Sequence, residues 1–186
     1  MAFLALKSLS VIFEMLIAAI DPGLNASAAL LECGVGKPRF AELTDLATLP
    51  DGETNRQIHV PHLCALLERW EPDCCVIENV QVPVMGANAK GQRKSVMSPS
   101  GAFRFGLGCG MIRGVVLAYQ IPVTMVHPRS WTRAFGLKGG DKKPHLAKLI
   151  ELHPETAPYL LRVKDHNRSD AGLMALWYAT MRGPLL

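Results

Sequence analysis

Three acidic residues in this chain stand where carboxylates are useful for chemistry. Asp21 ends the apolar run "MLIAAID", Glu78 ends the apolar run "CCVIE", and Asp170 opens a long apolar segment near the C-terminus. Packing gives no reason to gather such groups, because like charges repel one another and burying them is unfavourable. Mg²⁺ prefers oxygen ligands, and two such ions about 4 Å apart can promote cleavage of a phosphodiester. If the first two acids lie on neighbouring strands, the three predict a divalent-metal site.

His166 adds a nitrogen donor to this group. It precedes Asp170 by four residues, so both side chains fall on one face if the helix has begun by residue 166. An imidazole beside metal carboxylates can act as a ligand or can move the proton of a nucleophilic water. The candidate catalytic and metal-binding residues are therefore Asp21, Glu78, His166 and Asp170.

Each of these residues also has a structural explanation. Asp21 in "DPG" is a good turn residue, and Asp170 could be an acid favoured by the helix dipole. Glu78 is harder to explain, because glutamate is depleted in strands and is seldom buried unpaired. Only the joint placement of these acids favours chemistry. The remaining histidines, His59, His62, His127, His145 and His153, show no metal-type spacing.

The elements that must position these residues follow from the hydrophobic pattern. Short apolar runs with β-type residues predict strands over 15–21, 26–32, 37–46, 73–80 and 121–128. Helical spacing predicts helices over 61–70, 102–120, 141–154 and 165–182. Early strands joined by tight turns, followed by strand–helix units, indicate an α/β fold with a mixed sheet of about five strands flanked by helices.

Composition limits the class of protein. The chain has 186 residues, of which 49% are hydrophobic, and this suits one globular domain over 15–186. We expect residues 1–14 to be a dispensable N-terminal extension. The net charge of +4 is compatible with a phosphate-rich partner. Five cysteines without a C-x-x-C pair are typical of buried reduced thiols. With no signal peptide or membrane span recognised, we expect a cytoplasmic location.

Four blocks of the sequence, in order, resemble the RuvC family of Holliday-junction resolvases within the RNase H-like superfamily. They are "IAAIDPG", "CVIENV", "GMIRGVVLAYQIPVTMVHPRSWTRAFG" and "KDHNRSDAGLMALWYA". The last block is similar to plant chloroplast resolvases, whose H-x-R-x-acid pattern fits residues 166–170. Two features depart from bacterial members. No aromatic residue follows Glu78 closely, and Asn167 stands three residues before Asp170, where those members often carry an acid.

The resemblance implies an RNase H-like fold and an activity. Asp21, Glu78, His166 and Asp170 would hold two Mg²⁺ ions per site, with Mn²⁺ able to substitute, and no nucleotide cofactor would be needed. The reaction would be paired symmetric nicking of four-way DNA junctions. A homodimer is expected, because its two-fold axis matches the symmetry of the junction.

Basic and aromatic residues around this site are candidate DNA contacts. Cations could hold phosphates, and phenylalanines could stack on exposed bases. Alternatively the loop over 85–101 is simply solvated and the phenylalanines belong to the core. The stripe of Gly106, Gly110 and Gly114 predicts tight helix packing. The candidate DNA contacts are Lys90, Arg93, Lys94, Phe103, Arg104, Phe105, Lys138, Lys142, Lys143 and Arg168.

Other hypotheses remain beside the resolvase. One is a junction-binding protein that does not cleave. Another is an RNase H-like nuclease for forks, flaps or RNA–DNA hybrids. An actin-like kinase also starts with Asp and Gly after a strand, but it needs further phosphate-binding loops that this sequence lacks.

Overall fold

The computed structural model describes residues 15–181 apart from 24, 54, 81–85, 88–92, 95–96 and 139–141. The predicted extension over 1–14 lies outside the described residues. The strands are β1 (Met15–Asp21), β2 (Ser27–Cys33), β3 (Arg39–Asp45), β4 (Thr48–Asp51), β5 (Asn55–Ile58), β6 (Cys74–Glu78), β7 (Gly86–Ala87), β8 (Arg93–Lys94) and β9 (Val123–Val126). The helices are α1 (Val60–Trp70), α2 (Pro99–Ala118), α3 (Pro128–Ala134), α4 (Lys143–Leu152) and α5 (His166–Met181), with short 3-10 helices η1 (Pro154–Tyr159) and η2 (Val163–Asp165).

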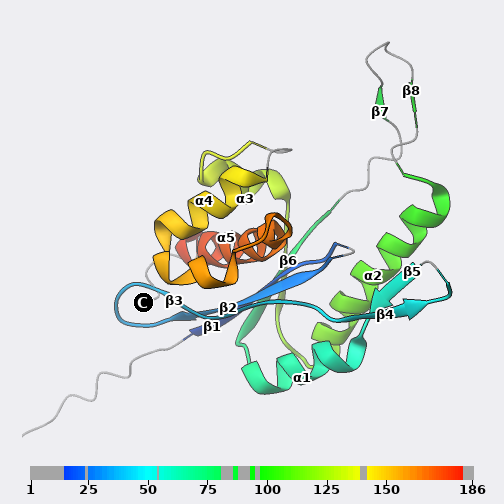
Figure 1. Ribbon diagram of the computed structural model, residues 1–186. Helices are drawn as coiled ribbons and strands as arrows, with labels where there is room; N and C mark the ends of the chain where they lie inside the picture. The colour runs from blue at the N-terminus through cyan, green and yellow to red at the C-terminus, as the bar shows by residue number, and fades with distance from the viewer. Residues whose placement is uncertain are drawn as a thin grey trace, which may run out of the picture.

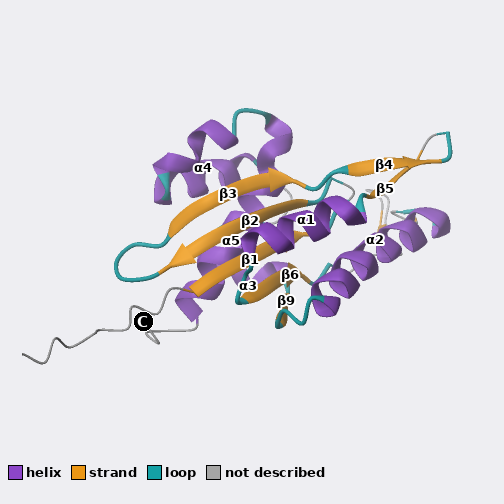
Figure 2. Cartoon of the chain, turned by 90° about the horizontal axis from the view of Figure 1, so that it is seen from below, coloured by secondary structure: helices purple, strands orange, loops and turns teal. Residues whose placement is uncertain are grey.

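The central sheet has five strands in the order β3-β2-β1-β6-β9 (Figures 1 and 2). Tight connections join the antiparallel pairs β1–β2 and β2–β3. The parallel pairs β1–β6 and β6–β9 require longer crossovers, which contain α1 and α2. The predicted mixed sheet is confirmed, and so is the assumption that the strands ending in Asp21 and Glu78 are neighbours.

Alternation along β1 separates two cores. Ile17 and Ala19 point into a core shared with α3, α4 and α5. Ala18 and Ile20 point into the opposite core, shared with α1 and α2. Figure 1 shows the same division, with α3–α5 on one face of the sheet and α1 and α2 on the other. Because side chains alternate along a strand, Asp21 follows Ala19 onto the α5 face.

Helix α5 packs closely because Gly172 has no side chain. A Cβ at this position would lie 2.8 Å from Cδ2 of Leu149 in α4 and 3.3 Å from Cδ2 of Leu43 in β3. Nine of the 16 residues of α5 are buried, including the run from Ser169 to Leu176. This close approach brings the start of α5 down onto the sheet.

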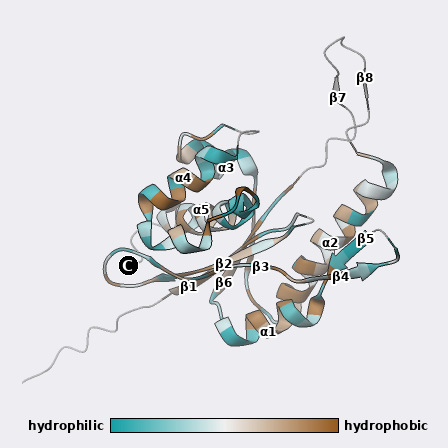
Figure 3. Cartoon of the chain, viewed as in Figure 1, coloured by the Kyte–Doolittle hydropathy of each residue, from teal (hydrophilic) through white to brown (hydrophobic). Residues whose placement is uncertain are grey.

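Helix α2, in contrast to α5, is mostly exposed. Only Ile112 and Val116 among its 20 residues are buried. Phe103 is 71% exposed and Leu107 is 50% exposed. Apolar residues occur along its whole length (Figure 3). Helix α2 is long and apolar enough to cross a membrane, but one such helix is only weak evidence of a membrane span. In the fold, α2 contacts α1, β5 and β9.

Some elements were not predicted from the sequence. The β4–β5 hairpin carries mostly exposed residues, so it lacks the apolar alternation that marks the central strands. Helix α3 is only seven residues long and follows directly from His127, whose Nδ1 accepts a hydrogen bond from the backbone N–H of Arg129 at 3.1 Å. The loop predicted over 85–101 contains the short pair β7–β8 and the start of α2.

Candidate active site

Asp21 and Glu78 emerge side by side at the carboxyl ends of β1 and β6. Ile20 pairs with Ile77 in the parallel ladder, so the next residue of each strand leaves the sheet at the same edge. Glu78 continues the alternation of Val76, which lies in the α5-side core. Both carboxylates therefore face α5. Asp21 is buried and Glu78 is half-buried.

Asp170 in α5 completes a cluster of three acids, the acidic cluster below. Its side chain is almost fully buried. The pKa of Asp21 is raised from an ordinary value near 3.8 to about 8, first by burial, then by the charges of Glu78 and Asp170. Burial also raises the pKa of Glu78, and the nearby Asp170 adds to this rise. Such mutual effects require the three carboxylates to be close, as the sequence analysis expected.

Lys142 supplies the positive charge in this cluster. Its Nζ lies 2.6 Å from Oδ2 of Asp170, and about half of its side chain is exposed. Burial lowers the pKa of Lys142, but Asp170, Asp21 and Glu78 together raise it above its ordinary range. The sequence analysis expected Lys142 to contact DNA phosphates. In this structure its ammonium instead lies on a carboxylate of the site.

Two buried rings contact the acids, and neither was predicted from the sequence as part of the site. Trp131 in α3 donates from Nε1 to Oε1 of Glu78 at 3.1 Å. Nδ1 of His145 in α4 lies 2.5 Å from Oδ1 of Asp170. One signal was available for His145: it lies four residues before Leu149, and so on the apolar face of its helix. An imidazole on such a face needs a polar partner.

His166 is the first residue of α5, one turn before Asp170, so the predicted shared helix is confirmed. Its Nδ1 lies 2.9 Å from the carbonyl oxygen of Val163. With Nδ1–H donating to this carbonyl, Nε2 keeps its lone pair for a ligand or a proton. Metal-binding histidines are commonly oriented in this way.

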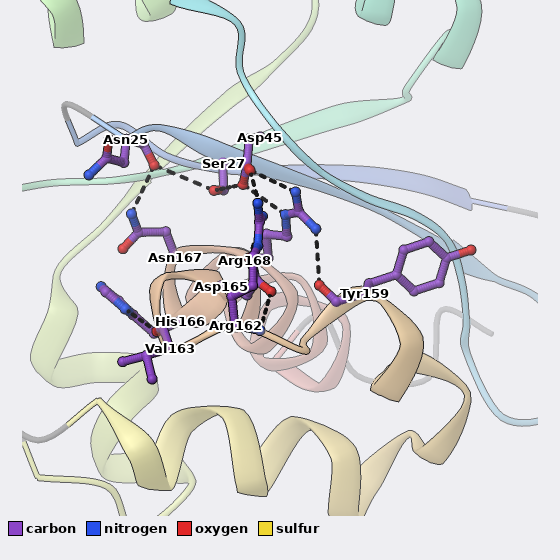
Figure 4. A network of polar contacts seen from close by, with 10 residues as sticks. All are labelled: Asn25, Ser27, Asp45, Tyr159, Arg162, Val163, Asp165, His166, Asn167 and Arg168. Atoms are coloured by element: carbon purple, nitrogen blue, oxygen red, sulfur yellow. Dashed lines mark hydrogen bonds and ion pairs between the residues drawn. The ribbon is translucent and has the colours of Figure 1, made fainter.

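A polar network fixes the start of α5 against the sheet (Figure 4). Asn167 Nδ2 donates to the carbonyl oxygen of Asn25 at 2.8 Å, in the turn that follows Asp21. Arg168 donates from Nε and Nη2 to Asp45 at the end of β3, at 2.7 and 2.6 Å, and from Nη1 to the carbonyl of Tyr159. The guanidinium predicted to contact DNA is thus engaged within the chain, and its DNA contact stays a prediction.

The other predicted DNA contacts are spread around the site. Phe103, Arg104, Lys138 and Lys143 are exposed. Arg104 and Phe105 line a shallow pocket that also includes Pro22 and Gly23, directly after Asp21. Lys90 lies outside the described residues. Arg93 and Lys94 form β8, and nothing is described of their side chains.

The donors present suit a divalent cation. In the described part of the chain, no group of three His, Cys, Asp or Glu side chains is close enough to bind one ion together. Mg²⁺ does not need such a cage, because it usually takes one or two protein carboxylates and completes its shell with water and phosphate. Two carboxylates with raised pKa values, beside a third that already holds an ammonium, form a site that favours added positive charge.

Comparisons with known proteins place the fold. No protein-family model matches the sequence, and no curated protein sequence matches it significantly. RuvC from Thermus thermophilus is similar at 16% identity over 90% of this chain and 97% of that chain, with a TM-score of 0.59. The same protein in complex with a Holliday junction substrate aligns at 17% identity over 90% and 96%, with a TM-score of 0.61. The yeast mitochondrial Holliday junction resolvase Ydc2 aligns at 15% identity over 94% and 84%, with a TM-score of 0.56. The chain therefore has the RuvC-type, RNase H-like fold that its sequence blocks implied.

Proposed function

We propose that this protein is a metal-dependent endonuclease that resolves four-way DNA junctions by paired nicks. The observation that carries the proposal is the acidic cluster, in which Asp21 and Glu78 end two parallel strands and Asp170 of α5 lies beside them. Burying three acids together destabilises a fold, so their joint placement needs a cation and a reaction to explain it. The RuvC-type fold supports this reaction class.

Each residue of the site has a defined task in this proposal. Bound Mg²⁺ or Mn²⁺, two ions per site, would activate a water and stabilise the leaving oxygen of the phosphodiester. Asp21, Glu78 and Asp170 supply oxygen ligands from two strands and a helix. His166, oriented through the Val163 carbonyl, offers Nε2 as a further ligand or as the acceptor of the water's proton.

The choice of a junction as substrate rests on the structural relatives. One of them was solved with a Holliday junction, and another is a Holliday junction resolvase. Exposed cations near the site suit the crowded phosphates of such DNA. Besides Arg104 and Lys138, Arg129 and Arg133 are exposed on α3, on either side of the buried Trp131. These two arginines were not predicted from the sequence as DNA contacts.

A homodimer would supply the two active sites that symmetric nicks require. The exposed apolar face of α2 supports this assembly. Phe103, Leu107 and Leu117 are large apolar side chains in solvent. A Cβ built on Gly106, Gly110 or Gly114 meets no atom within 4 Å, so the predicted close packing at these glycines is not made within the described residues. A second copy of α2 could make it.

Cleavage of labelled synthetic DNA tests the proposal. A four-way junction, matched duplex, fork and RNA–DNA hybrid are each incubated with Mg²⁺ or with EDTA. We expect paired nicks in the junction alone, only with metal, and a loss of more than about 100-fold in Asp21→Asn. Glu151→Gln, which changes an exposed carboxylate on α4, should cut like the parent. Junction binding without cutting, or full activity in Asp21→Asn, would refute this mechanism.

A further inference from the structure

Two aromatic rings from different helices meet behind the acidic cluster. Trp131 comes from α3 and His145 from α4, and both are almost fully buried. Their rings pack edge to face, with centroids 5.5 Å apart and an interplanar angle of 81°. Each ring has a nitrogen on a different acid, Trp131 on Glu78 and His145 on Asp170. The two rings and the two acids thus form one connected unit.

The direction of both hydrogen bonds follows from the chemistry of the rings. An indole can only donate, so Oε1 of Glu78 is the acceptor. Oδ2 of Asp170 accepts from Lys142, and a hydrogen on Nδ1 of His145 lets Oδ1 accept as well. Nε2 of His145 is buried and has no partner among the described residues. A bare lone pair there is better tolerated than an unpaired N–H, which favours the tautomer that carries its hydrogen on Nδ1.

A purely packing role does not explain these side chains. Phenylalanine or leucine would fill similar space without burying an indole N–H or an unpartnered imidazole nitrogen. Leaving a buried polar atom unpaired destabilises the fold. A stability loss of this kind, at a site proposed for chemistry, is typical of residues kept for function.

We propose that Trp131 and His145 are positioning residues that act as one unit on the metal-binding carboxylates. The inference rests on the proposed function. Each ring fixes one oxygen of its acid, Oε1 of Glu78 and Oδ1 of Asp170, and so orients the second oxygen. Oε2 of Glu78 has no hydrogen-bond partner among the described residues and is left for a cation. Oδ2 of Asp170 holds only the half-exposed ammonium of Lys142, which a cation can displace.

Metal binding without DNA tests this inference directly. Mn²⁺ is titrated into metal-free protein, and free Mn²⁺ is followed by electron paramagnetic resonance. We expect Trp131→Phe and His145→Leu to remain folded in thermal melts, at a melting temperature that the newly unpaired acid oxygen lowers, while weakening Mn²⁺ binding by about 10- to 100-fold. His145→Asn, whose amide can place a donor near the Nδ1 position, should recover most of the affinity. The double variant should lose less than the product of the single effects.

His153 offers a matched control. It is also buried, packs edge to face on Phe40 with centroids 5.0 Å apart, and has Nδ1 2.7 Å from an acid, Glu155. His153→Leu removes the same groups away from the acidic cluster and should leave Mn²⁺ affinity unchanged. In the cleavage assay, the Trp131 and His145 variants should lower kcat and leave KM for the junction near the parent value.

The outcomes separate this inference from the proposed function. Equal Mn²⁺ affinity in the parent, Trp131→Phe and His145→Leu would overturn the positioning role, even if all three cut junctions. An equal loss of affinity in His153→Leu would also overturn it, because the effect would then be general. A parent that binds Mn²⁺ but cuts no junction would remove the proposed function, whereas the expected order of affinities would still support the positioning role.

Discussion

Helices α5 and α2 lie on opposite faces of the same sheet and differ in how much of each helix is buried within the chain. In α5, nine of 16 residues are buried, and its first turn is tied to β3 and to the turn after β1. In α2, two of 20 residues are buried, although the helix is rich in apolar side chains. Both helices contain glycine, but Gly172 is closely packed whereas Gly106 faces open space.

This difference indicates where each helix finds its partners. The contacts of α5 are made within the chain, which suits a helix that must hold Asp170 at a fixed place. The apolar surface of α2 is not covered by the described residues, and a second copy is the partner that the proposed reaction requires. Four predictions test this contrast.

The largest effect is expected on self-association. Leu107→Glu places a charge on the exposed face of α2, and burying that charge in an apolar interface should weaken dimer formation by about 100-fold or more. Sedimentation velocity measures the change. Leu161→Glu is the control, because Leu161 is 82% exposed but lies just before η2, on the α5 side. If the parent were a monomer, or if Leu107→Glu stayed a dimer, the contrast between the helices would fail.

The next effect concerns the α5 face and depends on pH. Because burial and its acidic neighbours raise the pKa of Asp21 to about 8, the folded protein keeps a proton that the unfolded chain releases near pH 4. Stability without metal should therefore fall as the pH rises from about 4 to 8. Thermal melts in EDTA measure this fall, and Asp21→Asn should reduce it.

Divalent metal should oppose this loss, because it binds the deprotonated acids. We expect Mg²⁺ to raise the melting temperature more at pH 8 than at pH 5. A melting temperature in EDTA that does not change between these pH values would contradict the burial and grouping of the acids.

A pair of glycine substitutions compares the helices directly. Gly172→Ala puts a methyl group 2.8 Å from Leu149 and should destabilise the fold by about 1–3 kcal/mol. Gly106→Ala meets no atom within 4 Å and should stabilise a monomeric Leu107→Glu background by about 0.5–1 kcal/mol. Urea denaturation measures both. Equal effects would show that the two helices are packed alike.

The smallest effect is expected at the start of α5. Asp45→Asn weakens the ion pairs to Arg168 and Arg162. The Asp45 side chain is 44% exposed, so solvent screening limits the loss to about 1 kcal/mol or less. Although burial works in the opposite direction, the contacts with Arg168 lower the pKa of Asp45. The stability difference between parent and variant should therefore shrink in acid. A larger loss of stability in Asp45→Asn would contradict solvent screening of these ion pairs. No loss near neutral pH would show that they do not stabilise the start of α5.

The acids at the strand ends, Asp21 and Glu78, were predictable from the sequence. The two rings that contact the acidic cluster, Trp131 and His145, were not. Asp21 and Glu78 end apolar runs with a period-two pattern, and the fold type sets those runs side by side. Trp131 and His145 meet only because α3 and α4 both pack on α5, and such contacts leave no spacing in the sequence. The same reason hid the ion pair of Lys142: the sequence favoured a DNA contact for this lysine, and only the folded chain brings it to Asp170.

If the site binds metal as proposed, the ammonium of Lys142 makes metal loading an exchange rather than a simple addition. One positive charge already resides among the three acids, so an arriving cation must release it. Under the proposed function, the freed side chain remains tethered beside the reaction centre, where a DNA phosphate would approach. The ion pair seen here and the phosphate contact expected from the sequence then become successive states of one lysine, linking cofactor uptake to substrate capture.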